Sequence, residues 1–393
     1  MKKLLSILLA ALMLLALVPV AALAEVKSER IFRPSRDARG NTGTQVLQPL
    51  DACEWIAHPA YRDAAIPPDG LFLRFRHAFE SDGSPLELDV SADERYVLFV
   101  DGERVGRGPS RGWRENWLYE SRRIGLAKGP HVLEAAVWAL GKKAPNAQLS
   151  HRGGSFALKA DGAYHAQLTT GAAEWFVGCI DGTRAIGGYN ACGCCVSTRG
   201  LGFLDEEPAV WRKAKVVRPP LRGDTTMAGG IDGWRLYPTE LAEQTAVRVS
   251  PGRFVAARDG RGKKDDGVYG DDDLRDVRLA ALNGVLGGRP MTVPARMSLR
   301  AVWDLGDYYT PYPFVRVRGG SNAVVRLRFS EAPKDAQREK GNRNEIVGKS
   351  FGGAFRGDEL VSNGGESTLT TPWWRAGRYA ELLIETKDEP LEL

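Results

Sequence analysis

A loop near residue 110 combines side chains that suit recognition of a polyhydroxylated ligand. Residues 106 to 119 read Gly-Arg-Gly-Pro-Ser-Arg-Gly-Trp-Arg-Glu-Asn-Trp-Leu-Tyr. Aromatic faces stack on the apolar faces of sugar rings, while guanidinium and amide groups bond hydroxyl groups and fix orientation. We therefore predict a carbohydrate-binding site formed by Asp101, Arg111, Trp113, Arg114, Asn116, Trp117 and Tyr119.

A structural role for these residues is the alternative. Asp101 and Gly102 form the two-residue turn of a predicted hairpin, because this pair supplies positive φ angles. The aromatic side chains would then cap a β-sandwich. A calcium ion needs several oxygen ligands, and Asp101 supplies too few by itself. No cofactor is predicted, and calcium is kept as the one alternative.

Two acidic stretches were considered for other chemistry. Glycoside hydrolysis uses a pair of carboxylic side chains, and the polar run 330–349 contains Glu331 and Glu345, which a stand-alone glycosidase would use. The run 263–273 is rich in aspartate but lacks the spacing of a calcium-binding loop, so we predict a solvated loop there. No catalytic residue and no metal site is predicted.

Five cysteines leave three interpretations open. They are Cys53, Cys179, Cys192, Cys194 and Cys195. An exported protein would form one or two disulfides with one thiol left over, because an odd number cannot pair completely. Unpaired thiols are the second interpretation. A zinc site made by the last four is the third, although the paired C-x-x-C spacing of zinc modules is missing.

The N-terminus indicates export. Lys2 and Lys3 precede the apolar run 4–20 and the small residues Ala22-Leu-Ala24, which is the pattern of a secretory signal peptide. No later segment is apolar enough to cross a bilayer. Without the two lysines, the 54 basic residues fall to 52 against 49 acidic ones, and the charges are interspersed. This pattern argues against a nucleic-acid partner.

Short alternating strands must position the predicted site. In the first half they are 71–79, 86–90, 96–100, 132–138 and 155–159, and in the second 300–305, 314–318, 323–329 and 379–385. Glycine and proline punctuate these strands, which favours an all-β chain of two antiparallel, jelly-roll-like sandwiches in tandem.

The predicted divisions are signal peptide 1–24, leader 25–50, first sandwich 51–218, linker 219–235 and second sandwich 236–393. The four later strands are predicted to form one sheet system. Trp373 and Trp374 are expected to point to opposite sides of extended chain.

Motifs in both halves resemble one known family. They are 91–96 (SADERY), 99–106 (FVDGERVG), 107–110 (RGPS), 303–306 (WDLG), 328–332 (RFSEA), 342–348 (NRNEIVG) and 372–375 (PWWR). This set resembles the β-sandwich domains that precede the catalytic barrel of bacterial α-L-rhamnosidases, glycoside hydrolase family 78. Asp101-Gly102 stands where members commonly carry Asn-Gly. The resemblance covers nearly the whole mature chain.

The resemblance implies the function that we expect. The chain would be the non-catalytic front portion of an exported α-L-rhamnosidase-like protein, secreted, periplasmic or on the cell surface. It would support a catalytic (α/α) barrel and bind glycans that contain L-rhamnose. The family carries its general acid and base in that barrel, whose place would follow Leu393. A stand-alone glycosidase that uses Glu331 and Glu345 is the alternative.

Overall fold

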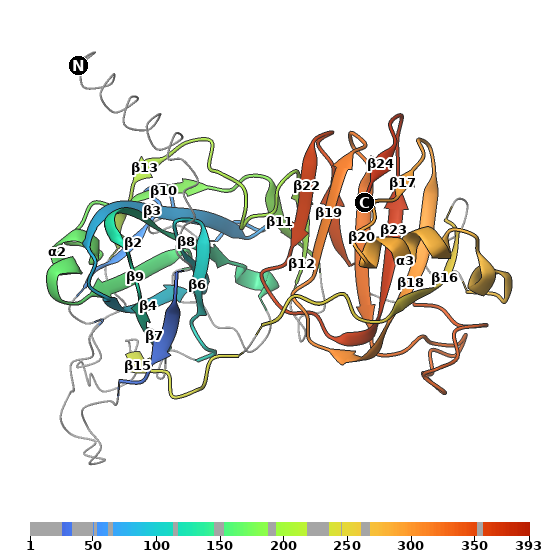
Figure 1. The fold of residues 1–393 in the computed structure, drawn as a ribbon, viewed down its shortest axis with the longest axis horizontal. Coiled ribbons are helices and arrows are strands. Elements are labelled where there is room, and N and C mark those ends of the chain that lie inside the picture. The colour runs from blue at the N-terminus through green and yellow to red at the C-terminus, as the bar shows by residue number, and fades with distance from the viewer. Residues whose placement is uncertain are drawn as a thin grey trace.

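The computed structural model describes residues 26–33, 50, 53–61, 66–112, 117–144, 153–187, 194–217, 236–244, 246–260, 268–351 and 357–393. Their regular structure is mostly antiparallel β-sheet, arranged as two sandwiches side by side (Figure 1). The all-β prediction is therefore confirmed. The predicted signal peptide, most of the leader and the linker lie outside these residues. None of the described helices is long and apolar enough to cross a membrane.

The first sandwich consists of two sheets. One has the order β1 (Ser28–Ile31), β7 (Trp117–Ile124), β4 (Leu86–Asp93), β9 (Ser155–Ala160), β2 (Trp55–Ala57) and β14 (Lys215–Val217), with β15 (Leu236–Pro238) also on β7. The other has the order β13 (Arg212–Lys213), β10 (Phe176–Cys179), β3 (Leu71–Asp82), β8 (Lys128–Ala139), β5 (Arg95–Val100) and β6 (Glu103–Gly108). The 3-10 helices η3 (Gly141–Lys143) and η4 (Gly162–Tyr164) and helix α2 (His165–Leu168) connect strands.

Alternation along the strands forms the first core. Leu86, Leu88 and Val90 on β4 point inward and are fully buried. From the facing sheet, Phe75 on β3 meets Phe156 on β9, with ring centres 5.4 Å apart. Period-two patterning therefore buries one face of each sheet, as the sequence predicts.

The second sandwich also has two sheets. The larger has the order β11 (Thr183–Ile186), β12 (Cys195–Arg199), β21 (Asp358–Val361), β20 (Val324–Ser330), β23 (Gly377–Glu385), β18 (Ser298–Tyr309) and β16 (Arg253–Asp259). The smaller has the order β17 (Thr292–Val293), β24 (Leu391–Glu392), β19 (Phe314–Gly319) and β22 (Glu366–Thr370). The 3-10 helix η5 (Asp272–Arg275) and helix α3 (Leu279–Leu286) lie between β16 and β17 in the chain. The strand β19 faces the other three predicted strands instead of pairing with them.

The two sandwiches exchange segments. The segment 183–199, which forms the hairpin β11–β12, falls within the range predicted for the first sandwich, but β12 pairs in parallel with β21 of the second. The strand β15, predicted to begin the second sandwich, pairs with β7 of the first. The divisions 51–218 and 236–393 therefore do not follow the hydrogen bonding. Each crossing segment gains a backbone ladder with the other half, which sequence patterning cannot reveal.

A continuous apolar core joins the sandwiches. The face of β5 opposite the first core carries Val97 and Phe99 toward the second sandwich, and Trp138 on β8 joins them. Phe203, which follows β12, lies between the halves with its ring centre 5.3 Å from that of Trp138 and 5.4 Å from that of Phe72. This face of the sheet is thus an internal layer rather than a surface. We call the boundary between the two sandwiches, where Phe72, Phe99, Trp138 and Phe203 lie, the seam.

Candidate functional site

Asp101 lies at the tip of the β5–β6 hairpin, as predicted. Asp101 and Gly102 have φ values of 51° and 81°, so both residues of the turn adopt the left-handed region. The Asp101 carboxylate lies 2.6 Å from the His131 ring nitrogen Nδ1 and accepts a hydrogen bond of 2.8 Å from the Val132 amide. Its oxygens hold the turn against β8, which fits the structural alternative.

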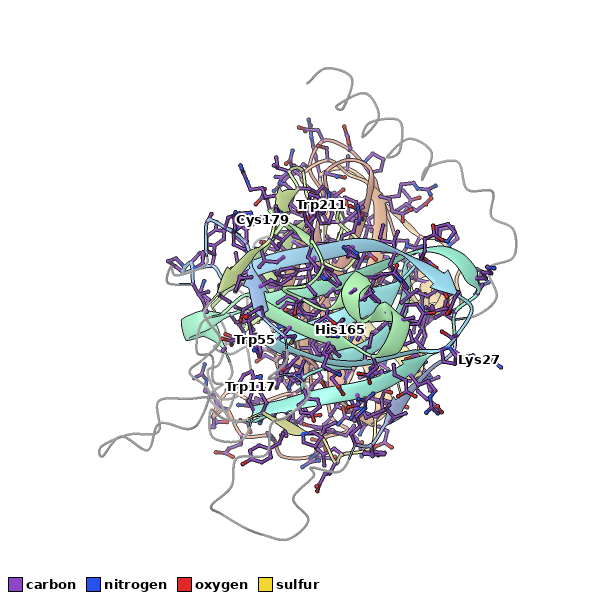
Figure 2. The ribbon with its side chains drawn as sticks, turned by 90° about the vertical axis from the view of Figure 1, so that its left-hand side faces the viewer. Lys27, Trp55, Trp117, His165, Cys179 and Trp211 are labelled. Carbon is purple, nitrogen blue, oxygen red and sulfur yellow. The ribbon has the colours of Figure 1, made fainter. Side chains whose placement is uncertain are left out.

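The structure contradicts the predicted role of Trp117 and Tyr119 as exposed stacking rings. Trp117 and Tyr119 are each only 1% exposed and pack in a small core with Trp55 on the outer face of the sheet (Figure 2). The Trp117 indole donates a hydrogen bond of 3.2 Å to the Ser91 hydroxyl. The strand β15 pairs beside β7, and its Leu236 packs in the same small core, so neither buried ring presents a face to a ligand. Trp113, Arg114 and Asn116 lie outside the described residues.

Arg111 is exposed and belongs to a different constellation. Its guanidinium carbon lies 5.1 Å from the centre of the Trp373 ring, in the second sandwich. The Arg95 guanidinium carbon lies 4.3 Å from the same centre. Both distances are within the range of a cation–π contact. Asp101 does not join them, because β6 separates the hairpin tip from Arg111 by a length of about 20 Å.

A third arginine completes the group. Val97 pairs with Arg107 across the hairpin, so Arg95 and Arg107 lie diagonally on the face that also carries Val97. The Arg107 guanidinium carbon is 3.6 Å from the centre of the Tyr312 ring, in the segment between β18 and β19. We call Arg95, Arg107 and Arg111, with the Trp373 and Tyr312 rings, the seam arginine cluster. Its cations come from one sandwich and its rings from the other.

A buried carboxylate lies beneath the cluster. Glu120 on β7 is fully buried and accepts hydrogen bonds of 2.7 Å from the Ser110 amide and 2.9 Å from the Tyr96 hydroxyl. The Arg30 guanidinium is 3.8 Å away. Burial raises the pKa of Glu120 in spite of these partners.

The cations of the cluster repel one another. Burial lowers the pKa of Arg95 to about 10, and the charges of Arg111 and Arg107 act in the same direction, against Tyr312 and Glu120. Burial likewise lowers the pKa of Arg107. Both guanidinium groups remain charged near neutral pH. The cluster is consequently a partly desolvated site of positive charge.

Trp373 and Trp374 are neighbours rather than opposites. Their ring centres are 5.9 Å apart, and Trp373 is buried in the seam while Trp374 is half-buried. The expected split into opposite sides is wrong, because both residues precede β23 and lie outside any strand. The pair places one partly accessible indole beside the seam arginine cluster.

Arg375 fixes this aromatic pair. It forms two hydrogen bonds of 2.6 Å with Asp358 and one of 2.9 Å with the Cys194 carbonyl, and its Nη1 donates to the Trp373 carbonyl at 3.2 Å. Asp358 also accepts a hydrogen bond of 2.9 Å from the Val196 amide. One buried ion pair thus joins β21, the crossing strand β12 and the tryptophans.

The carboxylates considered for catalysis lack the environment of a general acid. The Glu331 and Glu345 side chains are 45% and 62% exposed. A hydrogen bond from Lys340 holds the pKa of Glu331 below its usual value, whereas a general acid needs a raised pKa. In the part of the chain that the structure describes, no three His, Cys, Asp or Glu residues gather as metal ligands. Asp271 to Asp273 begin or lie in η5, and 261–267 are outside the described residues.

No disulfide joins any two of the cysteines that the structure describes. Cys194 and Cys195 are buried thiols whose pKa burial raises to about 12, and Cys179 is a half-buried thiol. The Cys53 thiol donates a hydrogen bond to the Leu50 carbonyl. Cys192 lies outside the described residues, so its pairing stays a prediction. A thiolate, which zinc requires, is disfavoured at Cys194 and Cys195.

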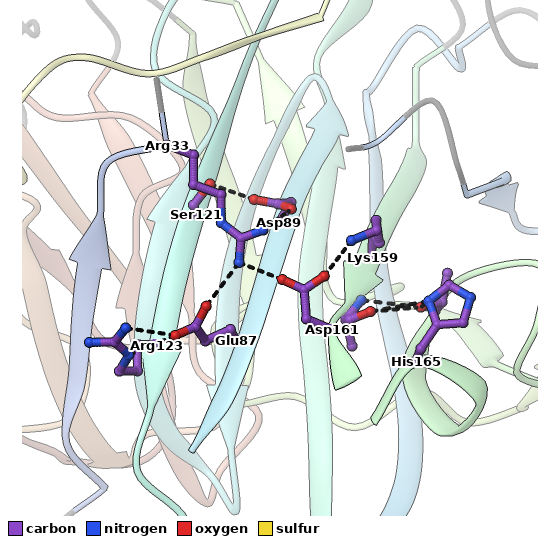
Figure 3. A network of polar contacts seen from close by, with 10 residues as sticks. Arg33, Glu87, Asp89, Ser121, Arg123, Lys159, Asp161 and His165 are labelled. Carbon is purple, nitrogen blue, oxygen red and sulfur yellow. Dashed lines mark hydrogen bonds and ion pairs between the residues drawn. The ribbon is translucent and has the colours of Figure 1, made fainter. Parts of the chain in front are cut away.

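A second polar network lies on the outer face of the first sandwich (Figure 3). Arg33 forms ion pairs with Glu87 and Asp89, each at 3.2 Å, and with Asp161 at 2.6 Å. Lys159 also contacts Asp161. Each carboxylate in this network has a cationic partner within the chain, so the network ties the N-terminal segment to the sheet.

Comparisons with known proteins define the class of the fold. The GH78 family rhamnosidase of Bacillus sp. GL1 matches with a TM-score of 0.61 and 14% identity, over 87% of this chain and 54% of that one. The α-L-rhamnosidases of Dictyoglomus thermophilum and Aspergillus terreus match with TM-scores of 0.45 and 0.46, at 13% and 14% identity, over 86% and 87% of this chain and 35% and 37% of theirs. No protein-family model and no curated protein matches the sequence.

The chain is therefore a tandem β-sandwich protein, and its fold is similar to that of part of the GH78 family rhamnosidase from Bacillus. The chain spans about half of the length of that enzyme. The resemblance predicted from the sequence motifs is thus confirmed at the level of the fold.

Proposed function

We propose that this chain is an exported, non-catalytic sandwich portion of a rhamnosidase-like protein, and that it binds carbohydrate. The fold that it shares with a GH78 rhamnosidase supports the relationship. The observation that carries the binding is the half-buried Trp374 ring next to Trp373, whose ring also contacts the exposed Arg111 at the seam. An aromatic face with adjacent hydrogen-bond donors suits a sugar ring, and domain boundaries commonly hold ligand sites.

The binding is tested by calorimetric titration of L-rhamnose and of a rhamnose-containing oligosaccharide. We expect saturable binding in the wild type that Trp374→Ala weakens by about 10-fold, because a stacked aromatic face that contributes about 1.4 kcal/mol corresponds to a tenfold change in affinity. Phe176→Ala is the matched control, since Phe176 is an exposed ring on β10. Titration with and without calcium tests the calcium alternative.

Two results would contradict this assignment. Equal affinity in the wild type and Trp374→Ala would move the site away from the seam. No binding of any sugar by a folded wild-type chain would overturn the binding function itself.

The same preparation tests for hydrolysis. We expect no release of the aryl group from an aryl α-L-rhamnoside, because the exposed Glu331 has a lowered pKa and would give up its proton too readily to act as general acid. Absorbance of the free aryl alcohol measures the rate. Turnover that Glu331→Gln or Glu345→Gln abolishes, while the exposed control Glu80→Gln leaves it intact, would establish the glycosidase alternative.

A further inference from the structure

We propose that the seam arginine cluster binds an anionic group of a saccharide, such as the carboxylate of a uronic acid. The saccharide part of this inference rests on the proposed function, and the anion part rests on the cluster alone. Three guanidinium groups meet two aromatic rings where the sandwiches join.

The spacing brings like charges together. The Arg95 and Arg111 guanidinium carbons lie 4.3 Å and 5.1 Å from one Trp373 ring centre, so their separation is at most the sum of these distances. Repulsion between such cations grows as water is removed, because the effective dielectric constant falls. An anion beside the exposed Arg111 would relieve this repulsion and so bind more tightly than it would to an isolated exposed arginine.

The protein supplies little counter-charge to the outer two arginines. Among the described residues, neither Arg107 nor Arg111 forms an ion pair with a carboxylate. Glu120, the carboxylate beneath the cluster, directs its oxygens at the Ser110 amide and the Tyr96 hydroxyl. Burial also raises its pKa. An external anion therefore has cations to bind.

The rings leave the donors available. A guanidinium group has five N–H donors along its edges, so Arg107 and Arg111 keep donors beyond their ring contacts, even though Arg107 also forms a hydrogen bond with Tyr312. These edges match the two oxygens of a carboxylate and can bond it in a bidentate manner. Arg107 and Tyr312 are half-buried and Arg111 is exposed, so a ligand can approach from solvent.

The neighbouring Trp374 suggests how a saccharide would be oriented. Its half-buried ring packs against Trp373, whose ring forms cation–π contacts with Arg95 and Arg111. A sugar stacked on Trp374 would place an attached or adjacent acidic group within reach of the arginines. Neutral hydroxyl groups would gain much less from three cations than a carboxylate does.

A matched pair of ligands tests the proposal. D-galacturonate and D-galactose differ in a carboxylate that replaces a hydroxymethyl group, and sodium sulfate serves as a plain anion. We expect galacturonate or its short oligomers to bind at least about 10-fold more tightly than galactose oligomers, since charge-assisted hydrogen bonds are about twice as strong as neutral ones. Raising the salt concentration should weaken the acidic ligand alone.

Arg107→Gln and Arg111→Gln are the test variants, with thermal unfolding as the check that each folds. We expect each to remove most of the preference for the acidic ligand. Arg316→Gln is the control, because Arg316 also lies over a ring, that of Phe314, but is exposed in the second sandwich and pairs with Glu366. Its preference should equal that of the wild type.

Each remaining outcome has a defined meaning. Equal binding of galacturonate and galactose would overturn the anion site while leaving the proposed carbohydrate binding intact. Sulfate binding that equals galacturonate binding, with none of galactose or rhamnose, would show an inorganic anion site and overturn the saccharide assignment. A preference that survives in both arginine variants would place the acidic group elsewhere and overturn the proposal.

Discussion

Replacing Arg375 by methionine is expected to lower the free energy of unfolding by about 3–5 kcal/mol, because the change leaves Asp358 as an uncompensated buried charge. The two side chains are 6% and 1% exposed. Although burial lowers the pKa of Arg375, the Asp358 carboxylate raises it above its usual value. The variant also loses the hydrogen bonds to the Cys194 and Trp373 carbonyls. Chemical denaturation measures the change.

Two further variants show whether the ion pair causes this loss. Arg296→Met removes an ion pair whose members are 81% and 83% exposed, so we expect no measurable change. Arg375→Met combined with Asp358→Asn should recover part of the loss, because the buried charge is gone while the amide oxygen still accepts from Val196. Comparable losses in Arg375→Met and Arg296→Met would contradict the assignment.

Stability should fall as the pH rises from about 4.5 to about 8 through the titration of Glu94. Burial raises the pKa of Glu94 to about 8, although the backbone amides of Leu140 and Gly141 donate hydrogen bonds of 2.9 Å and 3.0 Å to its carboxyl group. The native state therefore keeps a proton that the unfolded chain releases near its ordinary pKa of 4.5. The contribution is fully present below 4.5, declines through the window and amounts to about 3–5 kcal/mol.

Glu94→Gln isolates this contribution. The amide has the size of the protonated acid and does not titrate, so the difference in stability between variant and wild type should shift in favour of the variant as the pH rises through this window. Denaturation at intervals between pH 4.5 and 8.5 measures it. Glu80→Gln is the control on an exposed part of β3, and it should leave the pH profile unchanged. Parallel profiles for wild type and Glu94→Gln would refute the buried-acid assignment.

Local patterning was enough to predict nine of the strands and one turn, but not β7, which begins in the stretch 106–119 that the sequence analysis treats as a loop. Alternation at period two places Leu86, Leu88 and Val90 on one face of β4, and this holds wherever a sheet covers a core. The pair Asp101-Gly102 dictates a two-residue hairpin through its positive φ angles. Both are properties of neighbouring residues, so they survive without knowledge of the partner strands.

The candidate site could be predicted only in part. Arg111 lies in the stretch 106–119 that the sequence indicates as a binding loop, but Trp117 and Tyr119 in the same stretch are buried. They pack with residues from distant segments, such as Trp55 on β2 and Leu236 on β15, which lies more than a hundred residues away in the chain. The arginines Arg95 and Arg107 were visible within the sequence motifs, yet nothing local shows which face of the hairpin meets a second domain.

The sequence by itself determined that this is an all-β chain with period-two strands, because those patterns depend on the residues within each strand. Only the tertiary structure decided that β11–β12 joins the second sandwich and that Trp373 meets Arg95 across the seam. These contacts link residues more than 150 positions apart. The free energy that selects them comes from hydrogen-bond ladders and burial between distant segments, and no short window of sequence contains both partners.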